Sequence, residues 1–299
     1  MRVFIAFLAL SFSGHIACQS RHVHTHPAMG TEFRITISAT DTNGMAAAVR
    51  QSFARIDALE QSMSDYRADS ELNQLCGSTR WQTVSPDLYK VLRFSRELAK
   101  QSEGAFDPTI GPLSKLWRRA FRQQQFPDQE DILAARARVR WKGLKTGRQG
   151  QVRLRRENMQ LDLGGVAKGY ALDVVGAILR DAGFPAFIVD GGGDLLLGDP
   201  PVGEAGWTVF NSAMIDLSVK WCNIAIATSG DTYQYLDSEG IRYSHIIDPR
   251  TGLGTINEWE VTVIGPAAMV ADALASTVCV SGAAVFSYYP EYDRTIMVH

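Results

Sequence analysis

The sequence of 299 residues predicts an α+β fold, and three features of its apolar patterning support this. Residues 31–37 alternate polar and apolar side chains, as a half-buried strand does. Apolar residues then recur near the 3.6-residue helical period, at Ala46, Val49, Phe53, Ile56 and Leu59. The later strand and helix patterns do not follow a regular βαβ order, which favours an α+β arrangement over a purely parallel α/β sheet.

Helix boundaries and β-rich runs predict the remaining elements. The first helical stretch covers most of residues 41–75, and four more helices are expected over 85–101, 127–139, 167–182 and 268–278. Strands are expected over residues 152–163, 187–197, 207–210, 223–228 and 261–264.

The overall charge argues against one class of partner. The chain carries 30 basic and 32 acidic residues, for a formal net charge of −2. Because no strongly basic character results, binding to nucleic acid is not expected.

The N-terminus is typical of a secretory signal peptide over residues 1–18. Arg2 precedes the apolar run 3–12, which is too short to span a bilayer and is followed by small residues. The alternative is a buried N-terminal strand or helix. Ile16-Ala17-Cys18 resembles the end of a lipobox, although His15 stands where an aliphatic residue is usual. We therefore expect a periplasmic protein anchored in the inner membrane through acylated Cys18, with cleavage without lipidation as the alternative.

Residues 19–27 are polar and are expected to form a solvated tether before a single domain over residues 28–299. This stretch contains His22, His24 and His26. Alternate histidines can also bind a metal, which is the second interpretation.

The segment 161–170 suggests an anion site. Asp162 ends a strand pattern, Gly164 and Gly165 open a turn, and Lys168 lies in the first turn of the helix that follows. Unpaired N–H groups at a helix start and a lysine charge suit a phosphate. The spacing is not that of a P-loop, and a structural turn with a surface lysine is the alternative. A second glycine cluster, over residues 189–194, continues as strand and is interpreted as a bulge or close backbone packing.

Two further pairs of polar residues could carry chemistry. His245 has a suitable intrinsic pKa to accept a proton and lies three residues before Asp248 in a proline turn, although a structural histidine is equally compatible. Asp272 and Ser276 lie four apart and share one face if they are helical. Their oxygens suit a hard cation such as Mg²⁺, but an ordinary helix acid and a surface serine remain the alternative.

Taken in chain order, these segments resemble the ApbE family of FAD:protein FMN transferases. Residues 104–113 resemble the family's GAFDPTVGPL motif almost letter for letter, and residues 162–170 resemble DLGGIAKGY. The remaining likenesses are to MGT, Y…SE, TSG, HIIDPRTG and ADAL, at residues 28–31, 65–72, 228–230, 245–252 and 271–274. The resemblance implies an ApbE-like, T-fold-related α+β architecture that forms a single catalytic unit with FAD in a central cleft.

The resemblance also implies site residues. A magnesium ion would be held by the Gly165 carbonyl, Asp272 and Ser276. The family usually has threonine at the last of these positions, so a shift of the ligand to Thr277 is the alternative. The FAD site would be lined by Met29, Tyr66, Ala105, Phe106, Asp107, Asp162, Lys168 and Ile247.

By the same resemblance, the chain would cleave FAD and attach FMN through a phosphoester to a threonine or serine of a periplasm-facing redox protein, releasing AMP. Mg²⁺ and Lys168 would neutralise the pyrophosphate, and His245, oriented by Asp248, would act as the base. Two alternatives stay open. Water could replace the acceptor hydroxyl, giving an FAD pyrophosphatase, or the chain could bind flavin without turnover as a lipoprotein carrier.

Overall fold

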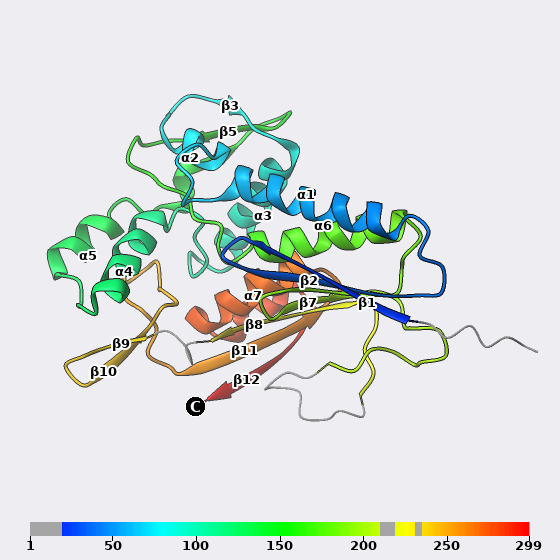
Figure 1. The fold of residues 1–299 in the computed structure, drawn as a ribbon. Helices are drawn as coiled ribbons and strands as arrows, with labels where there is room; N and C mark the ends of the chain where they lie inside the picture. The colour runs from blue at the N-terminus through cyan, green and yellow to red at the C-terminus, as the bar shows by residue number, and fades with distance from the viewer. Residues whose placement is uncertain (1–19, 210–218, 231–234, 299) are drawn as a thin grey trace, which may run out of the picture.

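The computed structural model describes residues 20–209, 219–230 and 235–298 (Figure 1). The expected signal peptide over residues 1–18, with Cys18, lies outside the described residues. Among those described, no helix combines the length and the apolar character that a membrane span requires.

A seven-stranded sheet forms the centre of the molecule, in the order β1-β2-β6-β7-β8-β11-β12. Every neighbouring pair in this sheet is antiparallel, which confirms the α+β class. The strands are β1 (Ser20–Ala28), β2 (Thr31–Ala39), β6 (Phe187–Gly191), β7 (Asp194–Leu197), β8 (Ile224–Gly230), β11 (Trp259–Gly265) and β12 (Asp293–Val298).

The two faces of the sheet are covered differently, as the period of two along each strand requires. Helices α1 (Met45–Met63), α6 (Ala167–Asp181) and α7 (Ala268–Ser281) pack on the face that carries Phe187 and Val189. The intervening residue Ile188 packs on the opposite face, in a cluster with Trp207 and Trp221 from the described stretches 199–209 and 219–223.

Residues 20–28 are strand β1, so the tether expected over residues 19–27 is wrong for the part that the structure describes. His22, His24 and His26 occupy alternate positions and are all half-buried, while the residues between them are exposed. The His26 ring stacks on Phe53 of α1 with centroids 4.9 Å apart. The histidine side chains therefore form the inward face of this strand. The polar composition of residues 19–27 does not indicate this role.

Helices α6 and α7 are held closely together by two features of α6. Gly169 lies so near α7 that a Cβ atom there would be 2.3 Å from the Ala268 carbonyl oxygen, which only glycine allows. The carboxylate of Asp173 accepts hydrogen bonds from the backbone N–H groups of Ala268 (2.8 Å) and Met269 (3.0 Å), and so caps the start of α7. These contacts fix the N-terminal turns of both helices relative to each other.

A second apolar cluster lies beside the sheet, around Trp117. It joins α4 (Gly111–Gln123) and α5 (Gln129–Arg136) to the hairpin β9 (Tyr235–Ser238) and β10 (Ile241–Ser244). Helix α4 was not among the expected helices. Pro112 lies in its first turn, where proline is well tolerated.

The remaining elements include a group around α2 and α3, and η2, which follows α7 and contacts it. They are α2 (Glu71–Cys76), α3 (Pro86–Gln101), η1 (Trp141–Gly143), η2 (Ala283–Tyr288) and the small sheet β3 (Gln82–Thr83), β5 (Gln151–Leu154) and β4 (Leu144–Thr146). Of the strand expected over residues 152–163, only the start is β-structure, and the expected strand 207–210 contains only an isolated bridge between Trp207 and Trp221 among its described residues.

Candidate functional site

The loop from Asp162 to Gly169 links two polar clusters that together contain four of the expected site residues, Tyr66, Asp162, Lys168 and Asp272. Asp162 lies at the start of the loop, and its Oδ1 accepts a hydrogen bond from the Gly164 N–H at 2.8 Å. Lys168 lies at the other end, in the first turn of α6. The sequence therefore brings an acid and a lysine to opposite ends of one short glycine turn.

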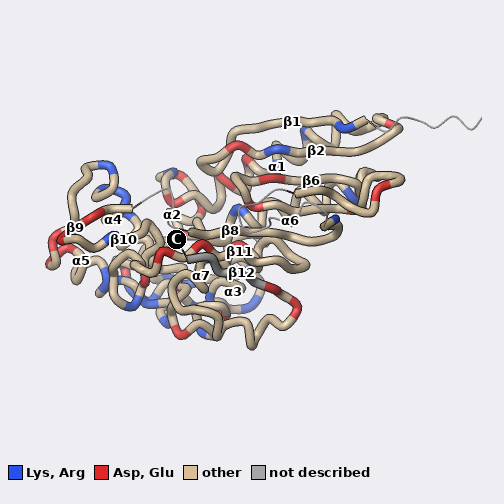
Figure 2. The backbone as a smooth tube through the Cα atoms, turned by 90° about the horizontal axis from the view of Figure 1, so that it is seen from below, with Lys and Arg blue, Asp and Glu red and all other residues tan. Residues whose placement is uncertain are grey.

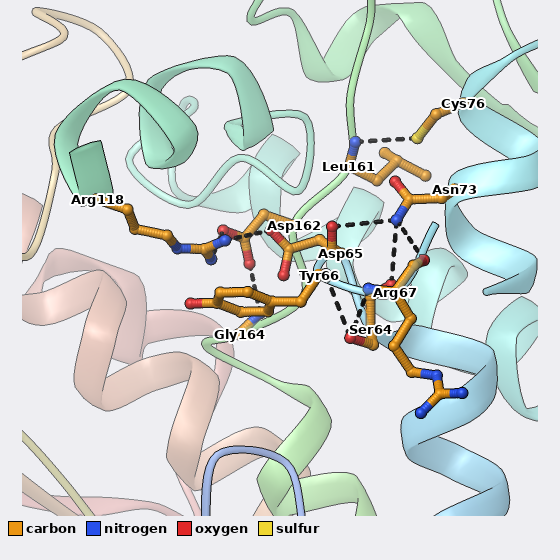
Figure 3. A network of polar contacts seen from close by, with 10 residues as sticks. All are labelled: Ser64, Asp65, Tyr66, Arg67, Asn73, Cys76, Arg118, Leu161, Asp162 and Gly164. Atoms are coloured by element: carbon orange, nitrogen blue, oxygen red, sulfur yellow. Dashed lines mark hydrogen bonds and ion pairs between the residues drawn. The ribbon is translucent and has the colours of Figure 1, made fainter. Parts of the chain in front are cut away.

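The first cluster is centred on Arg118 of α4 (Figure 3). Its guanidinium contacts Asp65 and donates to Asp162 Oδ2 at 2.8 Å, and its carbon lies 4.2 Å from the centre of the Tyr66 ring. Burial and the neighbouring charge of Asp162 raise the pKa of Asp65. One cation thus holds together two largely buried carboxylates that would otherwise repel each other.

Tyr66 presents an aromatic surface at this cluster, because the residue is 74% exposed. The backbone that carries it is fixed by Asn73, whose amide donates to the carbonyl oxygens of Asp65 (3.1 Å) and Arg67 (2.8 Å). An exposed ring on a rigid turn suits stacking against a flat heterocycle.

The second cluster consists of Lys168, Asp194 and Asp272. The Lys168 ammonium contacts Asp194 and lies 3.6 Å from Asp272 Oδ2, which also accepts the Gly169 N–H at 3.0 Å. Burial by itself would lower the pKa of Lys168, but the charges of Asp272 and Asp194 raise it well above the ordinary value. Burial raises the pKa of Asp272 to about 6, although the Lys168 charge acts against this.

Gly165, Ser276 and Phe106 lie beside these charges. A Cβ atom on Gly165 would be 3.3 Å from Ser276 Oγ and 3.7 Å from the Phe106 ring. Ser276 Oγ is also 3.5 Å from Ser229 Oγ at the end of β8. The neighbouring Thr277 is fully buried, and its hydroxyl donates to the Ala273 carbonyl at 2.6 Å. Of the two hydroxyls, that of Ser276 is therefore the one on the side of the glycine loop.

The oxygen donors of this cluster suit a hard cation. The described residues contain no group of three or more histidines, cysteines or acids that could hold a metal ion. A metal site with several charged protein ligands is therefore absent from this part of the chain. A carbonyl (Gly165), one carboxylate (Asp272) and one hydroxyl (Ser276) are the limited set with which Mg²⁺ binds when it retains several waters. The residues present therefore fit Mg²⁺.

Asp107 is bonded within the protein. Its Oδ1 accepts from the N–H (2.8 Å) and the hydroxyl (2.7 Å) of Thr109, and its Oδ2 accepts the Trp141 N–H at 2.9 Å. Burial raises the pKa of this carboxyl. The side chain thus fastens the turn that carries the buried residues Ala105 and Phe106 to η1, and its expected place in the FAD site stays a prediction.

Asp248 pairs with a neighbouring arginine. Its carboxylate accepts from Arg250, at 2.9 Å between Oδ2 and Nη2 and 2.9 Å between Oδ1 and Nε. Its expected role of orienting His245 stays a prediction. His245 itself is exposed directly after β10, while Ile247 is buried in the cluster around Trp117.

Met29, another of the expected FAD-site residues, lies at the tip of the β1–β2 hairpin. Met29 and Gly30 connect Ala28 to its partner Thr31 and have φ values of 50° and 75°, as a two-residue type I′ turn requires. The glycine cluster interpreted as a bulge or close backbone packing is the corresponding turn between β6 and β7. The bulge is wrong, but the close packing is confirmed, since a Cβ atom on Gly191 would be 3.1 Å from the Phe33 ring.

Asp194 is the site residue that the sequence analysis missed. It directly follows that second turn, is 4% exposed, and accepts the Thr228 N–H at 3.2 Å in addition to its contact with Lys168. The sequence does contain a signal for this residue, because Asp194 stands directly before an apolar strand. Such a buried carboxylate requires a cation nearby.

Comparisons with known proteins agree on one family. The model of the ApbE family matches residues 29–295. The chain is 31% identical to a FAD:protein FMN transferase of Vibrio cholerae over 270 residues, which cover 86% of this chain and 80% of that protein. A mutant form of the flavin transferase ApbE from Vibrio cholerae superposes with a TM-score of 0.82 at 29% identity, covering 93% of this chain and 94% of the other. The apo form of the flavinyl transferase ApbE from Pseudomonas stutzeri gives a TM-score of 0.82 at 26% identity, covering 94% and 92%.

Proposed function

The chain belongs to the ApbE family, and from this premise we propose that it is a magnesium-dependent enzyme that transfers FMN from FAD to another protein. The acceptor group is a threonine or serine hydroxyl, and AMP is the leaving group. The observation that carries the proposal is the position of Lys168 between Asp194 and Asp272, beside Gly165 and Ser276. A fixed ammonium next to a cation site is suited to a pyrophosphate.

The residues that would hold Mg²⁺ are the Gly165 carbonyl, Asp272 and Ser276. The ion, when bound, supplies positive charge that stabilises the phosphates of FAD. Lys168 contributes a second positive charge, and its raised pKa keeps it protonated throughout the neutral range. Asp194 holds the ammonium in place on the side facing β7.

The flavin nucleotide would extend from this charge cluster to Tyr66 along the loop that begins at Asp162. Arg118 supports the Tyr66 ring from one side, and Asp65 and Asp162 fix Arg118. Met29, Ala105, Phe106 and Ile247 are the apolar residues that the family resemblance adds to this site.

In the transfer step, the acceptor hydroxyl oxygen attacks the phosphorus beside the riboflavin half of FAD. The bond from that phosphorus to the bridging oxygen breaks, and this oxygen leaves with AMP. The hydroxyl proton passes to His245, which is exposed and therefore within reach of a second protein. The product carries FMN as a phosphoester.

The site of action follows from the N-terminal sequence. Signal-peptide cleavage before Cys18 and its acylation would place the domain at the periplasmic face of the inner membrane, where a membrane-associated redox protein is a suitable acceptor. Trypsin accessibility in spheroplasts, with and without Cys18→Ser, tests this placement.

The proposed activity is tested by incubating the pure chain with FAD and Mg²⁺ in the presence and absence of an acceptor redox subunit. We expect AMP release and in-gel flavin fluorescence on the acceptor, both lost in EDTA and restored by Mg²⁺. Rapid AMP release without acceptor would identify an FAD pyrophosphatase instead. Binding of FAD without AMP in either mixture would identify a flavin carrier.

A further inference from the structure

The strongest feature outside the proposed site is a concentration of positive charge. Residues 132–156 contain nine lysines and arginines and no acidic residue, although the chain as a whole has 30 basic and 32 acidic residues. The overall composition therefore conceals a local excess. The nine residues are Arg136, Arg138, Arg140, Lys142, Lys145, Arg148, Arg153, Arg155 and Arg156, and we call them the cationic surface.

The fold brings these side chains together from the end of α5, from η1 and from strands β4 and β5. Two adjoining surface cavities of about 470 and 480 Å³ are lined by members of the set, and Arg156 lines both. Six of the nine residues are exposed and the other three are half-buried. Six of the nine line these cavities, and Arg156 joins the two groups into one continuous surface: Arg136, Arg138, Arg140, Lys142, Arg155 and Arg156.

These charges are not neutralised within the described parts of the chain. None of the nine forms an ion pair there, whereas Arg118, Arg119 and Arg250 all do. Burial and the adjacent charges, that of Arg155 foremost, lower the pKa of Lys145. The acids that face the two cavities are Glu103, Glu157 and the inward-bonded Asp107. Repulsion among these positive charges destabilises the folded chain, and an anionic partner bound to them would reduce that repulsion.

The cationic surface adjoins the proposed active site. The cavity lined by Arg140 and Lys142 is also lined by Gly104 and Asp107, whose segment positions Phe106. Its other wall contains Pro249 and Arg250, from the turn that follows His245. A chain bound here would therefore lie next to the two segments that the transfer step uses.

We propose that the cationic surface binds an acidic segment of the acceptor protein and thereby presents the acceptor hydroxyl to the site. This inference rests on the proposed function. Opposite charges across an interface steer association and fix the orientation of the partner. Because the charges extend over two cavities, they match a chain segment better than the single diphosphate of FAD.

The position of the surface favours a protein over a membrane. The Ser20 end of β1, which leads to the proposed lipid anchor, lies at one end of the molecule (Figure 2), and α5 lies at the other in both views. A surface that begins at α5 therefore does not share the end from which the chain would be tethered.

Binding can be tested without turnover. The probes are two fluorescent peptides with one threonine each, flanked on both sides by aspartates in one and by asparagines in the other. We expect the full chain to bind the aspartate peptide at least about tenfold more tightly by anisotropy at low salt, with the difference lost at about 0.5 M NaCl, where charges are screened. The triple variant Arg140→Ala, Lys142→Ala, Arg156→Ala should lose this preference.

A matched control removes three exposed charges elsewhere, with Arg50→Ala, Arg93→Ala and Lys100→Ala, and should keep the preference. Equal binding of the two peptides to the wild-type chain, or an unchanged preference in the cationic triple variant, would overturn the proposal. A weaker FAD affinity in that variant would instead make the surface part of the flavin site. If the variant lost only its binding to phosphatidylglycerol vesicles, the surface would belong to the membrane. The outcome does not depend on FMN transfer, which in-gel flavin fluorescence on the acceptor reports separately for the wild-type chain.

Discussion

The Lys168 ammonium lies 3.6 Å from Asp272 Oδ2 and also contacts Asp194, so one lysine serves two carboxylates from different elements. The three charges sum to −1 in a cluster where both acids are almost fully buried. A divalent cation would reverse that sign at the point where a pyrophosphate must bind. Tight packing of α6 on α7, which Gly169 permits, is what brings these charges together.

Replacing Asp194 by asparagine should impair both stability and transfer. The substitution leaves Lys168 with one carboxylate instead of two and loosens the ammonium. We expect a loss of about 1–3 kcal/mol in unfolding free energy, since one partner of a largely buried ion pair is removed, and at least a tenfold fall in kcat/KM. Urea unfolding and the FMN-transfer assay measure these changes. Asp190→Asn in the same hairpin is the control, because its side chain accepts only from the exposed Gly193 N–H. Equal effects in both variants would contradict a special role for Asp194.

Binding of Mg²⁺ should weaken in mild acid. Asp272 has a raised pKa of about 6, so in the metal-free chain the folded state holds its proton more tightly than the unfolded state does. The contribution of Asp272 to stability is therefore present below its ordinary pKa and is lost as the pH rises from about 4 to 6. Mg²⁺ must displace that proton, and its Kd at pH 5 should be about tenfold higher than at pH 7. Calorimetric titration tests this, and a constant Kd over that range would rule it out. Asp272→Asn should abolish binding at both pH values.

The choice between two neighbouring hydroxyls gives a third prediction. Ser276→Ala should raise the Kd for Mg²⁺ by about tenfold, or about 1.4 kcal/mol, whereas Ser276→Thr keeps the oxygen and should bind normally. Thr277→Val is the matched control, because that hydroxyl already donates to the Ala273 carbonyl inside α7. If Thr277→Val weakened Mg²⁺ binding and Ser276→Ala did not, the ligand assignment would be reversed.

Elements with a strong local pattern were predictable from the sequence, and those that depend on distant partners were not. Helices α3, α6 and α7 match the expected ranges closely because each combines a boundary signal with regular apolar spacing. Strand β1 was missed because its inward face is made of histidines, and the ring of Phe53 that accepts His26 lies in a different element.

The same distinction applies to the site. Lys168 and Ser276 stand in motifs that can be recognised along the chain. The pairing of Lys168 with Asp194 depends on the β6–β7 hairpin, and the pairing of Asp248 with Arg250 depends on the geometry of a turn. Spacing places His245 and Asp248 in one turn, but it does not show that the Asp248 carboxylate also accepts from Arg250.

Arg118→Leu should destabilise the chain more at pH 8 than at pH 5. Without the guanidinium, Asp65 and Asp162 face each other as unpaired carboxylates in a largely buried cluster. The pKa of Asp65 is already raised, and losing Arg118 should raise it further. A raised carboxyl pKa in the folded state contributes stability that is lost as the pH rises through it. We expect a loss of about 2–3 kcal/mol in unfolding free energy at pH 8 and a smaller loss at pH 5, measured by urea unfolding.

Arg119→Leu, next along α4, is the control. The ion pair of Arg119 with Asp131 is solvent-exposed, so its loss should change stability by no more than about 0.5 kcal/mol at either pH. Equal losses at both pH values for Arg118→Leu would show that packing, and not charge, holds this cluster.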